Sequence, residues 1–195
     1  LAAGMVAAAR PGGALDFSVM AATGLGISLP VYWLALLLML VFSIRLNWLP
    51  AVGAGTPGHL VLPAITLALP TAASLARLVR SSVLDVRHAD YVRTARAKGL
   101  ATGPLWWRHI LRNGLIPVIT MLGLHLGHLL GGAFVVETLF AWPGLGRLVV
   151  QSVFDRDFPV LLGGVLLIAL IYQVLNLAAD LVHAWLDPRV GHEAL

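Results

Sequence analysis

Three ionisable residues lie in or beside one long apolar stretch of the chain. His125 and His128 are three positions apart, and Glu137 closes the same stretch. Residues three apart share a face of a helix, and ionisable groups within a membrane-spanning helix usually mark a pathway or a buried pair. The three side chains could therefore line the path of a solute or relay protons. The other interpretation is that the histidines are neutral and hydrogen-bonded to adjacent helices.

Glu137 has two further interpretations of its own. It stands ahead of a turn that contains Trp142, Pro143 and two glycines, with Arg147 just beyond. Its carboxylate could anchor that turn through backbone amides or through Arg147. It could instead act in an external gate or in a contact with a protein outside the membrane.

Other kinds of site lack the residues that they need. A zinc site takes three or four ligands, and no third ligand can be identified beside the two histidines, whose spacing also differs from the His-Glu-x-x-His pattern of zinc proteases. Lys98 is the only lysine and stands between Ala97 and Gly99, so the Gly-Lys-Ser/Thr sequence of a phosphate-binding loop is absent. We therefore expect no catalytic residue, no metal site and no cofactor bound by this chain.

The elements that position these residues are predicted to be membrane-spanning helices. Hydrophobic residues make up 59% of the 195 positions and charged residues only 11%. Four runs without Asp, Glu, Lys or Arg cover 17–44, 60–76, 113–136 and 158–179. Crossing a bilayer takes about 20 apolar residues, and backbone groups in lipid must be satisfied within a helix. The composition thus predicts an all-α polytopic membrane protein, a single domain over 1–195.

The apolar residues 1–9 are too few to cross a membrane. They indicate the end of an earlier helix, which would make this chain a fragment, in addition to the four complete transmembrane helices. Of the thirteen Arg and Lys residues, eight lie between Arg77 and Arg112, and Arg10 and Arg189 fall on the same side if each run crosses once. Because basic residues concentrate in cytoplasmic loops, we place the 86–112 loop and the C-terminus in the cytoplasm. The basic character therefore indicates orientation in a lipid bilayer, and nucleic acid is not an expected partner.

The 86–112 loop is predicted to form two short amphipathic helices about a glycine corner. The first covers 88–98, and Gly99 follows where a helix C-terminus favours a residue with positive φ. One of its faces holds Tyr91, Val92 and Ala95, flanked by Arg93 and Arg96. In the second helix four apolar residues share one arc and two arginines lie opposite: Trp106, Trp107, Ile110 and Leu111, with Arg108 and Arg112. Such a loop could lie among lipid headgroups or dock into a groove of another protein.

The sequence of this loop resembles a known family. Residues 90–117, DYVRTARAKGLATGPLWWRHILRNGLIP, resemble the cytoplasmic EAA loop of ABC-importer permeases, and more closely its dipeptide, oligopeptide and nickel branch. Thr94 and Ala95 stand at the start of the pattern and Gly99 is its glycine. The acidic residue and the proline of the strict pattern are absent at their positions. VVETLFAWPGLGRLV at 135–149, the stretch 26–50 and the closing segment with Asp187, Pro188 and Arg189 resemble the B-type subunit of this branch.

The resemblance implies a permease subunit of an ATP-driven importer for peptides or a related small solute such as nickel. It implies a second permease subunit, two cytoplasmic ATPase subunits that use ATP, and an extracytoplasmic solute-binding protein, in the inner membrane of a bacterial or archaeal cell. The loop would then couple to the ATPases through seven residues: Asp90, Tyr91, Val92, Arg93, Ala95, Arg96 and Gly99. The substrate stays open between dipeptides, longer peptides, glutathione-like solutes and nickel. An alternative is an ion-coupled secondary transporter in which His125, His128 and Glu137 relay protons.

Overall fold

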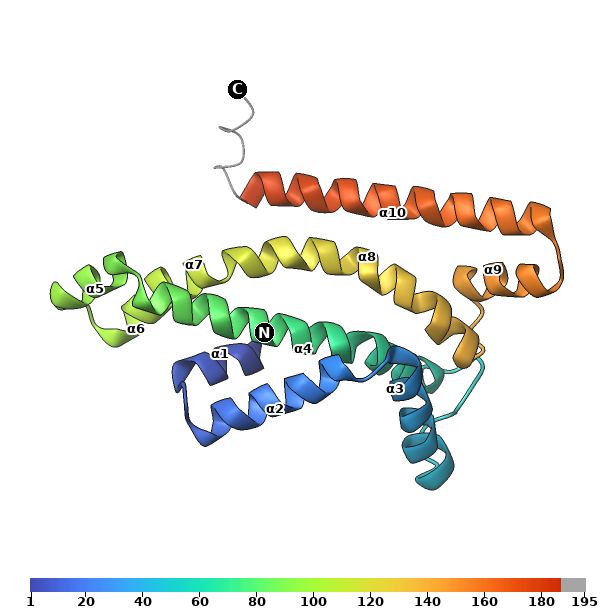
Figure 1. Ribbon diagram of the computed structural model, residues 1–195, viewed down its shortest axis with the longest axis horizontal. Coiled ribbons are helices and arrows are strands. Elements are labelled where there is room, and N and C mark those ends of the chain that lie inside the picture. The colour runs from blue at the N-terminus through green and yellow to red at the C-terminus, as the bar shows by residue number, and fades with distance from the viewer. Residues whose placement is uncertain (187–195) are drawn as a thin grey trace. The chain divides into compact units, whose positions relative to one another are not determined.

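The described part of the chain is helical throughout and contains no strand (Figure 1). The computed structural model describes the backbone of residues 1–186, and the side chains there except those at 120, 123, 124, 126–128, 130, 180 and 182–186. The helices are α1 Ala2–Ala9, α2 Ala14–Ser28, α3 Val31–Leu38, η1 Met39–Arg45, α4 Gly58–His88, α5 Asp90–Ala97, α6 Thr102–Pro104, η2 Leu105–Leu111, α7 Arg112–Gly114, α8 Ile116–Leu139, α9 Leu145–Phe154 and α10 Phe158–Leu186. The predicted all-α class is confirmed for this part of the chain.

Two of the described helices, α4 and α10, are long and apolar enough to cross a membrane. A third candidate arises if α2 and the α3–η1 segment count as one span. The run predicted at 17–44 is therefore not one continuous helix, because the chain leaves helical geometry at Leu29 and Pro30. Proline has no N–H to donate into a helix and favours the start of a new one. The third predicted run lies in α8, whose side chains are described only in part, so the number of four spans stays a prediction.

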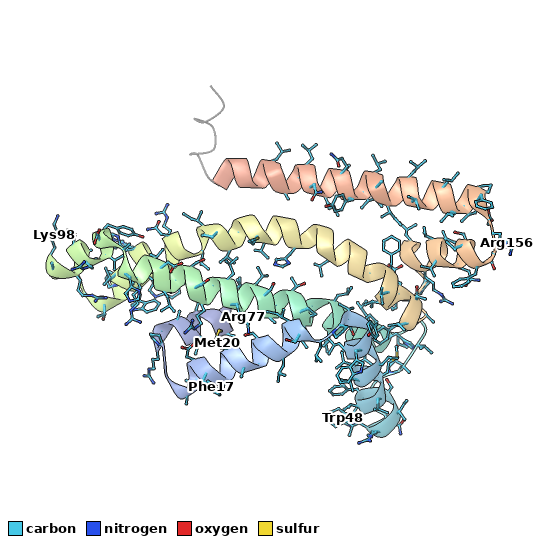
Figure 2. All side chains as sticks on the ribbon, in the orientation of Figure 1. Phe17, Met20, Trp48, Arg77, Lys98 and Arg156 are labelled. Atoms are coloured by element: carbon cyan, nitrogen blue, oxygen red, sulfur yellow. The ribbon has the colours of Figure 1, made fainter. Side chains whose placement is uncertain are left out.

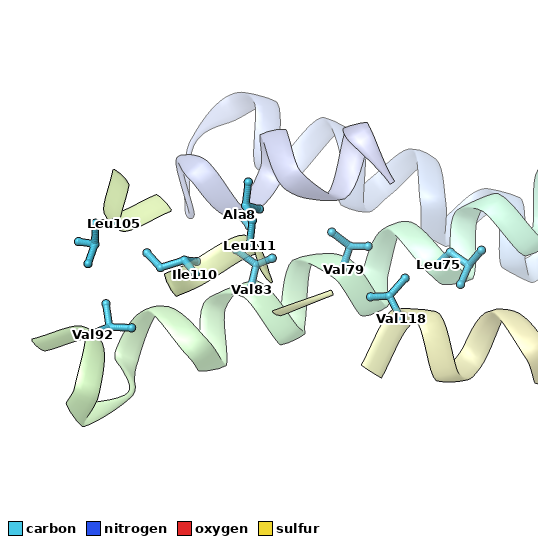
Figure 3. Close-up of a cluster of buried hydrophobic side chains, with 9 residues drawn as sticks. All are labelled: Ala8, Leu75, Val79, Val83, Val92, Leu105, Ile110, Leu111 and Val118. Carbon is cyan, nitrogen blue, oxygen red and sulfur yellow. The ribbon is translucent and has the colours of Figure 1, made fainter. Parts of the chain in front are cut away.

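The chain divides into two compact units, each described here by itself. The first includes Leu1–Ile27 and Ala72–Gly123, and the second Ser28–Thr71 and Leu124–Val182. The single domain predicted from the sequence stays a prediction. In the first unit, buried side chains from α1, α4, α5, η2 and α8 form one cluster (Figure 3): Ala8, Leu75, Val79, Val83, Val92, Leu105, Ile110, Leu111 and Val118. This cluster joins the 86–112 loop to the helix that precedes it.

Helix α2 is held against α4 by polar contacts that the sequence did not predict, and α1 packs closely against α4. The buried carboxylate of Asp16 accepts two hydrogen bonds from the guanidinium of Arg80, and the second joins Nη2 to Oδ2 at 2.7 Å. Arg77, labelled on α4 in Figure 2, donates to the hydroxyl of Thr23 at 3.4 Å. A side chain at Gly4 would overlap the backbone carbonyl of residue 76. The N-terminal helices of this unit are therefore fixed to α4 over several turns.

The second unit has a smaller core formed by α3, the N-terminal part of α4 and the C-terminal end of α8. Its buried members are Ala35, Leu62, Val136 and Phe140. The loop after η1 is tied to this core by the N–H of Gly53, which donates to the carbonyl of Phe140 at 2.8 Å. This core holds the C-terminal end of α8, where Glu137 lies.

Candidate functional site

The first helix of the 86–112 loop ends as the sequence predicts. Gly99 has φ +80°. The N–H of Gly99 donates to the carbonyl of Arg96, and the N–H of Leu100 donates to the carbonyl of Ala95. These two bonds are the Schellman arrangement, in which a glycine in the left-handed region closes a helix. The corner between the two parts of the loop is thus set by local chemistry.

Val92 lies inside the protein, which differs from the expectation that it inserts into a partner. Its side chain is 0% exposed and packs in the cluster with Leu105 and Ile110 of η2 (Figure 3). Ala95 is half-buried against the same cluster. The apolar stripe predicted on this helix exists, but it holds α5 onto its own chain. Burying it there removes apolar surface from water without requiring a partner.

The outward face of α5 is polar and charged. Asp90, Arg93 and Arg96 are exposed, and Tyr91 is 46% exposed. Arg93 Nη1 lies 3.5 Å from Asp90 Oδ1, but both side chains are largely in solvent, so this pair restrains the surface little. A partner that contacts α5 would therefore first meet an aromatic ring and two arginines.

The second part of the loop has π-helical rather than α-helical geometry. In a π-helix the hydrogen bonds run from i to i+5, so residues five apart share a face. Leu105 and Ile110 are accordingly both buried. Trp106 is half-buried, but Trp107 is 73% exposed. The predicted arc was wrong for Trp107, because it assumed the α-helical spacing.

Asn113 is a residue of this region that sequence reasoning missed. Its side-chain amide donates to the phenol oxygen of Tyr91 at 3.2 Å and to the carbonyl of His109 at 2.9 Å. It thereby joins the exposed ring on α5 to the turn that leads into α8. Its position 22 residues from Tyr91 carries no periodic signal, so only the fold brings the two together.

Glu137 anchors the turn that follows α8, as one of its two interpretations proposed. Its Oε2 accepts a hydrogen bond from the backbone N–H of Arg147 at 3.0 Å. Arg147 is the third residue of α9, and the N-cap residue Gly144 has no side chain to cap the helix. A carboxylate at this position satisfies a free N–H and interacts favourably with the helix dipole. The anchor acts through a backbone amide.

Two glycines make room for this carboxylate. A Cβ at Gly144 would overlap the carboxyl group of Glu137, and one at Gly146 would lie 2.8 Å from the Cα of Phe134 and 2.9 Å from Glu137 Oε2. Beside them is a cavity of about 180 Å³, lined by Ala133, Phe134, Glu137, Leu145, Gly146, Ile168 and Ile171. Among the described residues of this lining, Glu137 is the charged one.

The two histidines of α8 are described unequally. His125 is half-buried, whereas the side chain of His128 lies outside the described residues, as do Asp187, Pro188 and Arg189. Within the described side chains, no group of three or more His, Cys, Asp or Glu is placed to hold a metal ion. Whether the histidines share a polar path stays a prediction.

With this geometry established, the family follows from comparison with known proteins. The model of the family "binding-protein-dependent transport system inner membrane component" matches residues 1–192. The chain belongs to this family. The family indicated by the EAA-like loop is thereby confirmed, and the match covers both compact units and all the described helices.

Individual members of the family are also similar over nearly the whole chain. A glutathione transport system permease protein of Pectobacterium atrosepticum is 47% identical over 193 residues, and that of Escherichia coli strain K12 is 46% identical over 193 residues. Both matches cover 99% of this chain and 63% of the relative. The corresponding protein of Salmonella choleraesuis is 49% identical over 168 residues, which are 86% of this chain and 55% of the relative. The chain thus spans less than two thirds of the length of these relatives.

Proposed function

We propose that this chain is a permease subunit of an ATP-driven importer that carries short peptides or peptide-like solutes such as glutathione. The observation that carries the proposal is the 46–47% identity to permease proteins of glutathione transport systems across 99% of the chain. The apolar helices α4 and α10 support a location in the cell membrane. The family's dependence on a binding protein argues against the ion-coupled alternative, for which the anchored carboxylate of Glu137 offers no support.

The partners follow from the same proposal. A second permease subunit would complete the pore, two ATPase subunits would bind on the cytoplasmic side, and an extracytoplasmic binding protein would deliver the solute. The 86–112 loop would receive the ATPase, and the C-terminus would lie in the cytoplasm. The translocation path would include His125, His128 and the region of Glu137.

The packing of the loop supports a role in coupling. Val92 of α5, Leu105 and Ile110 of η2, and Val83 of α4 belong to one buried cluster. Because a packed core transmits displacement rather than absorbing it, a push on α5 would be passed to α4. Asn113 provides a second connection, from Tyr91 toward α8. Asp90, Arg93, Arg96 and Gly99 would then act at the surface and corner of α5, and Val92 and Ala95 inside it.

Reconstitution tests the proposal directly. The full-length subunit, its permease partner and the ATPases are placed in liposomes, and uptake of labelled glutathione, dipeptides and Ni²⁺ is measured with the binding protein outside. We expect uptake of the peptide-like solutes only when ATP, the ATPases and the binding protein are all present.

Three results would contradict this expectation. Uptake without the ATPases would show that transport is not driven by ATP. Uptake driven by a proton gradient alone would restore the ion-coupled alternative. Uptake of Ni²⁺ with no uptake of peptides would keep the importer but overturn the substrate class.

A further inference from the structure

The outward face of η2 and α7 carries an aromatic ring and two arginines. Trp107 is 73% exposed, and Arg108 and Arg112 are also exposed. Within the described part of the chain, neither guanidinium takes part in a hydrogen bond or an ion pair. No Asp or Glu occurs between Tyr91 and Glu137 in the sequence. This face is therefore positively charged and has no neighbouring acidic residue along the chain to neutralise it.

The π-helical geometry fixes which residues form this face. Leu105 and Ile110, five apart, are buried in the cluster of the first unit. Trp107 and Arg112, also five apart, are both exposed. Turning Trp107 inward would require the register of η2 to change and would expose Leu105 or Ile110. Because burying a large apolar side chain stabilises a protein by about 1.5–3 kcal/mol, the exposed ring of Trp107 would gain from contact with a surface outside this chain.

The position of the face in the chain indicates what that environment is. Arg112 is four residues before Ile116, where the 24-residue apolar helix α8 begins. At a rise of about 1.5 Å per residue, Arg112 lies roughly 6 Å from the start of this helix. Tryptophan favours the membrane–water interface, and guanidinium groups bind phosphate oxygens through paired hydrogen bonds. Both preferences are met at the depth of lipid headgroups.

We propose that Trp107, Arg108 and Arg112 form a binding face for the headgroups of anionic phospholipids. The ring would lie at the level of the headgroups, and the two guanidinium groups would bind lipid phosphates. The face lies on η2 and α7, whereas the residues assigned to ATPase contact lie on α5 and at its C-terminal corner. The loop would thus be held by the membrane on one element and by the ATPase on another.

Fluorescence quenching by brominated lipid tests this face in the assembled transporter with the full-length permease. Vesicles of phosphatidylcholine receive increasing fractions of brominated phosphatidylglycerol or, separately, brominated phosphatidylcholine. The emission of Trp107 is obtained as the difference between the parent protein and Trp107→Phe. We expect quenching at lower fractions of phosphatidylglycerol than of phosphatidylcholine. Removing each arginine, by Arg108→Gln and Arg112→Gln, should weaken the preference about fivefold, since a basic residue near an anionic surface contributes about 1 kcal/mol.

The matched control is the pair Arg93→Gln and Arg96→Gln, which removes the same charge from α5 and should leave the lipid preference of Trp107 unchanged. Equal quenching by the two lipids in the parent protein would overturn the proposal. So would a preference that survives the loss of both Arg108 and Arg112. If the emission of Trp107 were the same in both lipids and changed only when the ATPase was removed from the complex, the face would bind a protein partner instead.

Discussion

At the scale of single residues, the carboxylate of Glu137 caps helix α9, whose own N-cap residue has no side chain to do so. Helix α9 begins after Gly144, whose lack of a side chain leaves the first N–H groups uncapped from within the turn. From the end of α8, Glu137 accepts a hydrogen bond from one of these groups, the N–H of Arg147. The absence of a side chain at Gly144 and Gly146 is what allows the carboxylate to approach. The turn thus depends on a carboxylate and two glycines acting together.

We expect Gly146→Ala to destabilise the protein by about 1–3 kcal/mol, the usual cost of overpacking a filled site. The new Cβ would meet the backbone of Phe134 as well as the carboxylate, and backbone cannot move aside easily. Thermal unfolding of the purified subunit in detergent measures the effect. Gly131→Ala is the control, because it meets nothing within 4 Å and lies inside α8. Equal stability of the two variants would refute the crowding at Gly146.

At the scale of elements, α4 organises the first unit. Its later turns bind α2 through Arg80 and Asp16, and its Val83 packs with Val92 of α5. An ionised pair away from water is tolerated only when both partners are present and well bonded. The pair therefore fixes how α2 lies on α4, and its loss would leave a charge without a partner.

We expect Arg80→Met to destabilise the first unit several times more than Arg93→Met. Arg80 pairs with a carboxylate that is only 4% exposed, whereas the partner of Arg93 is in solvent. Adding Asp16→Asn to Arg80→Met should recover part of the loss, since the unpaired charge is then gone. A double-mutant cycle of thermal stability measures the coupling between the two residues. Additive effects in the cycle would show that the ion pair does not hold the helices.

At the scale of the whole molecule, the exposed apolar surface is that of a membrane protein. Almost none of the apolar span in α10 is buried in its own unit, and large side chains along it are exposed, among them Leu162, Leu166 and Leu170. A helix that is apolar all round needs lipid or another protein around it. The family assignment and the helices thus agree on where the chain resides, and the 86–112 loop is its main charged segment.

We expect Arg96→Glu to reduce ATP-driven uptake about tenfold or more while thermal stability stays unchanged. Arg96 is exposed on α5, and its side chain forms no hydrogen bond or ion pair within the described part of the chain. The arginines of α5 would bind an acidic surface of the ATPase, and reversing the charge of Arg96 would replace this attraction with a repulsion of several kcal/mol. Uptake in liposomes and the melting temperature are measured on the same preparation.

Arg156→Glu serves as the control for this variant, because Arg156 is exposed on the side predicted to face outward. Ala95→Glu is a poorer probe, since Ala95 is half-buried and a charge there would disturb the cluster itself. Normal uptake by the Arg96→Glu variant would show that this face of α5 does not take part in the proposed coupling.

Much of the local structure could be predicted from the sequence. The apolar runs, the charge clustered in one loop and Gly99 at a helix end all depend on neighbours in the chain, and the structure has helices in these places with Gly99 at φ +80°. The helix break at Leu29 and Pro30 also had a local signal, which is the proline. It was missed because the apolar run is long enough for one span. The π-helical register of η2 had no such signal in the sequence, so the prediction that Trp107 shares a face with Ile110 and Leu111 was wrong.

The sequence by itself determined that the chain is helical and apolar, which family it belongs to, and where its basic residues cluster. These properties depend on the composition, on short motifs and on the spacing of residues that are close together in the chain. Only the tertiary structure decided that Val92 faces inward, that Asp16 pairs with Arg80 and that Glu137 caps α9. The physical reason is that any apolar surface can bury an apolar stripe, and any opposite charge can pair with a charged group. Which one it finds depends on residues far away along the chain.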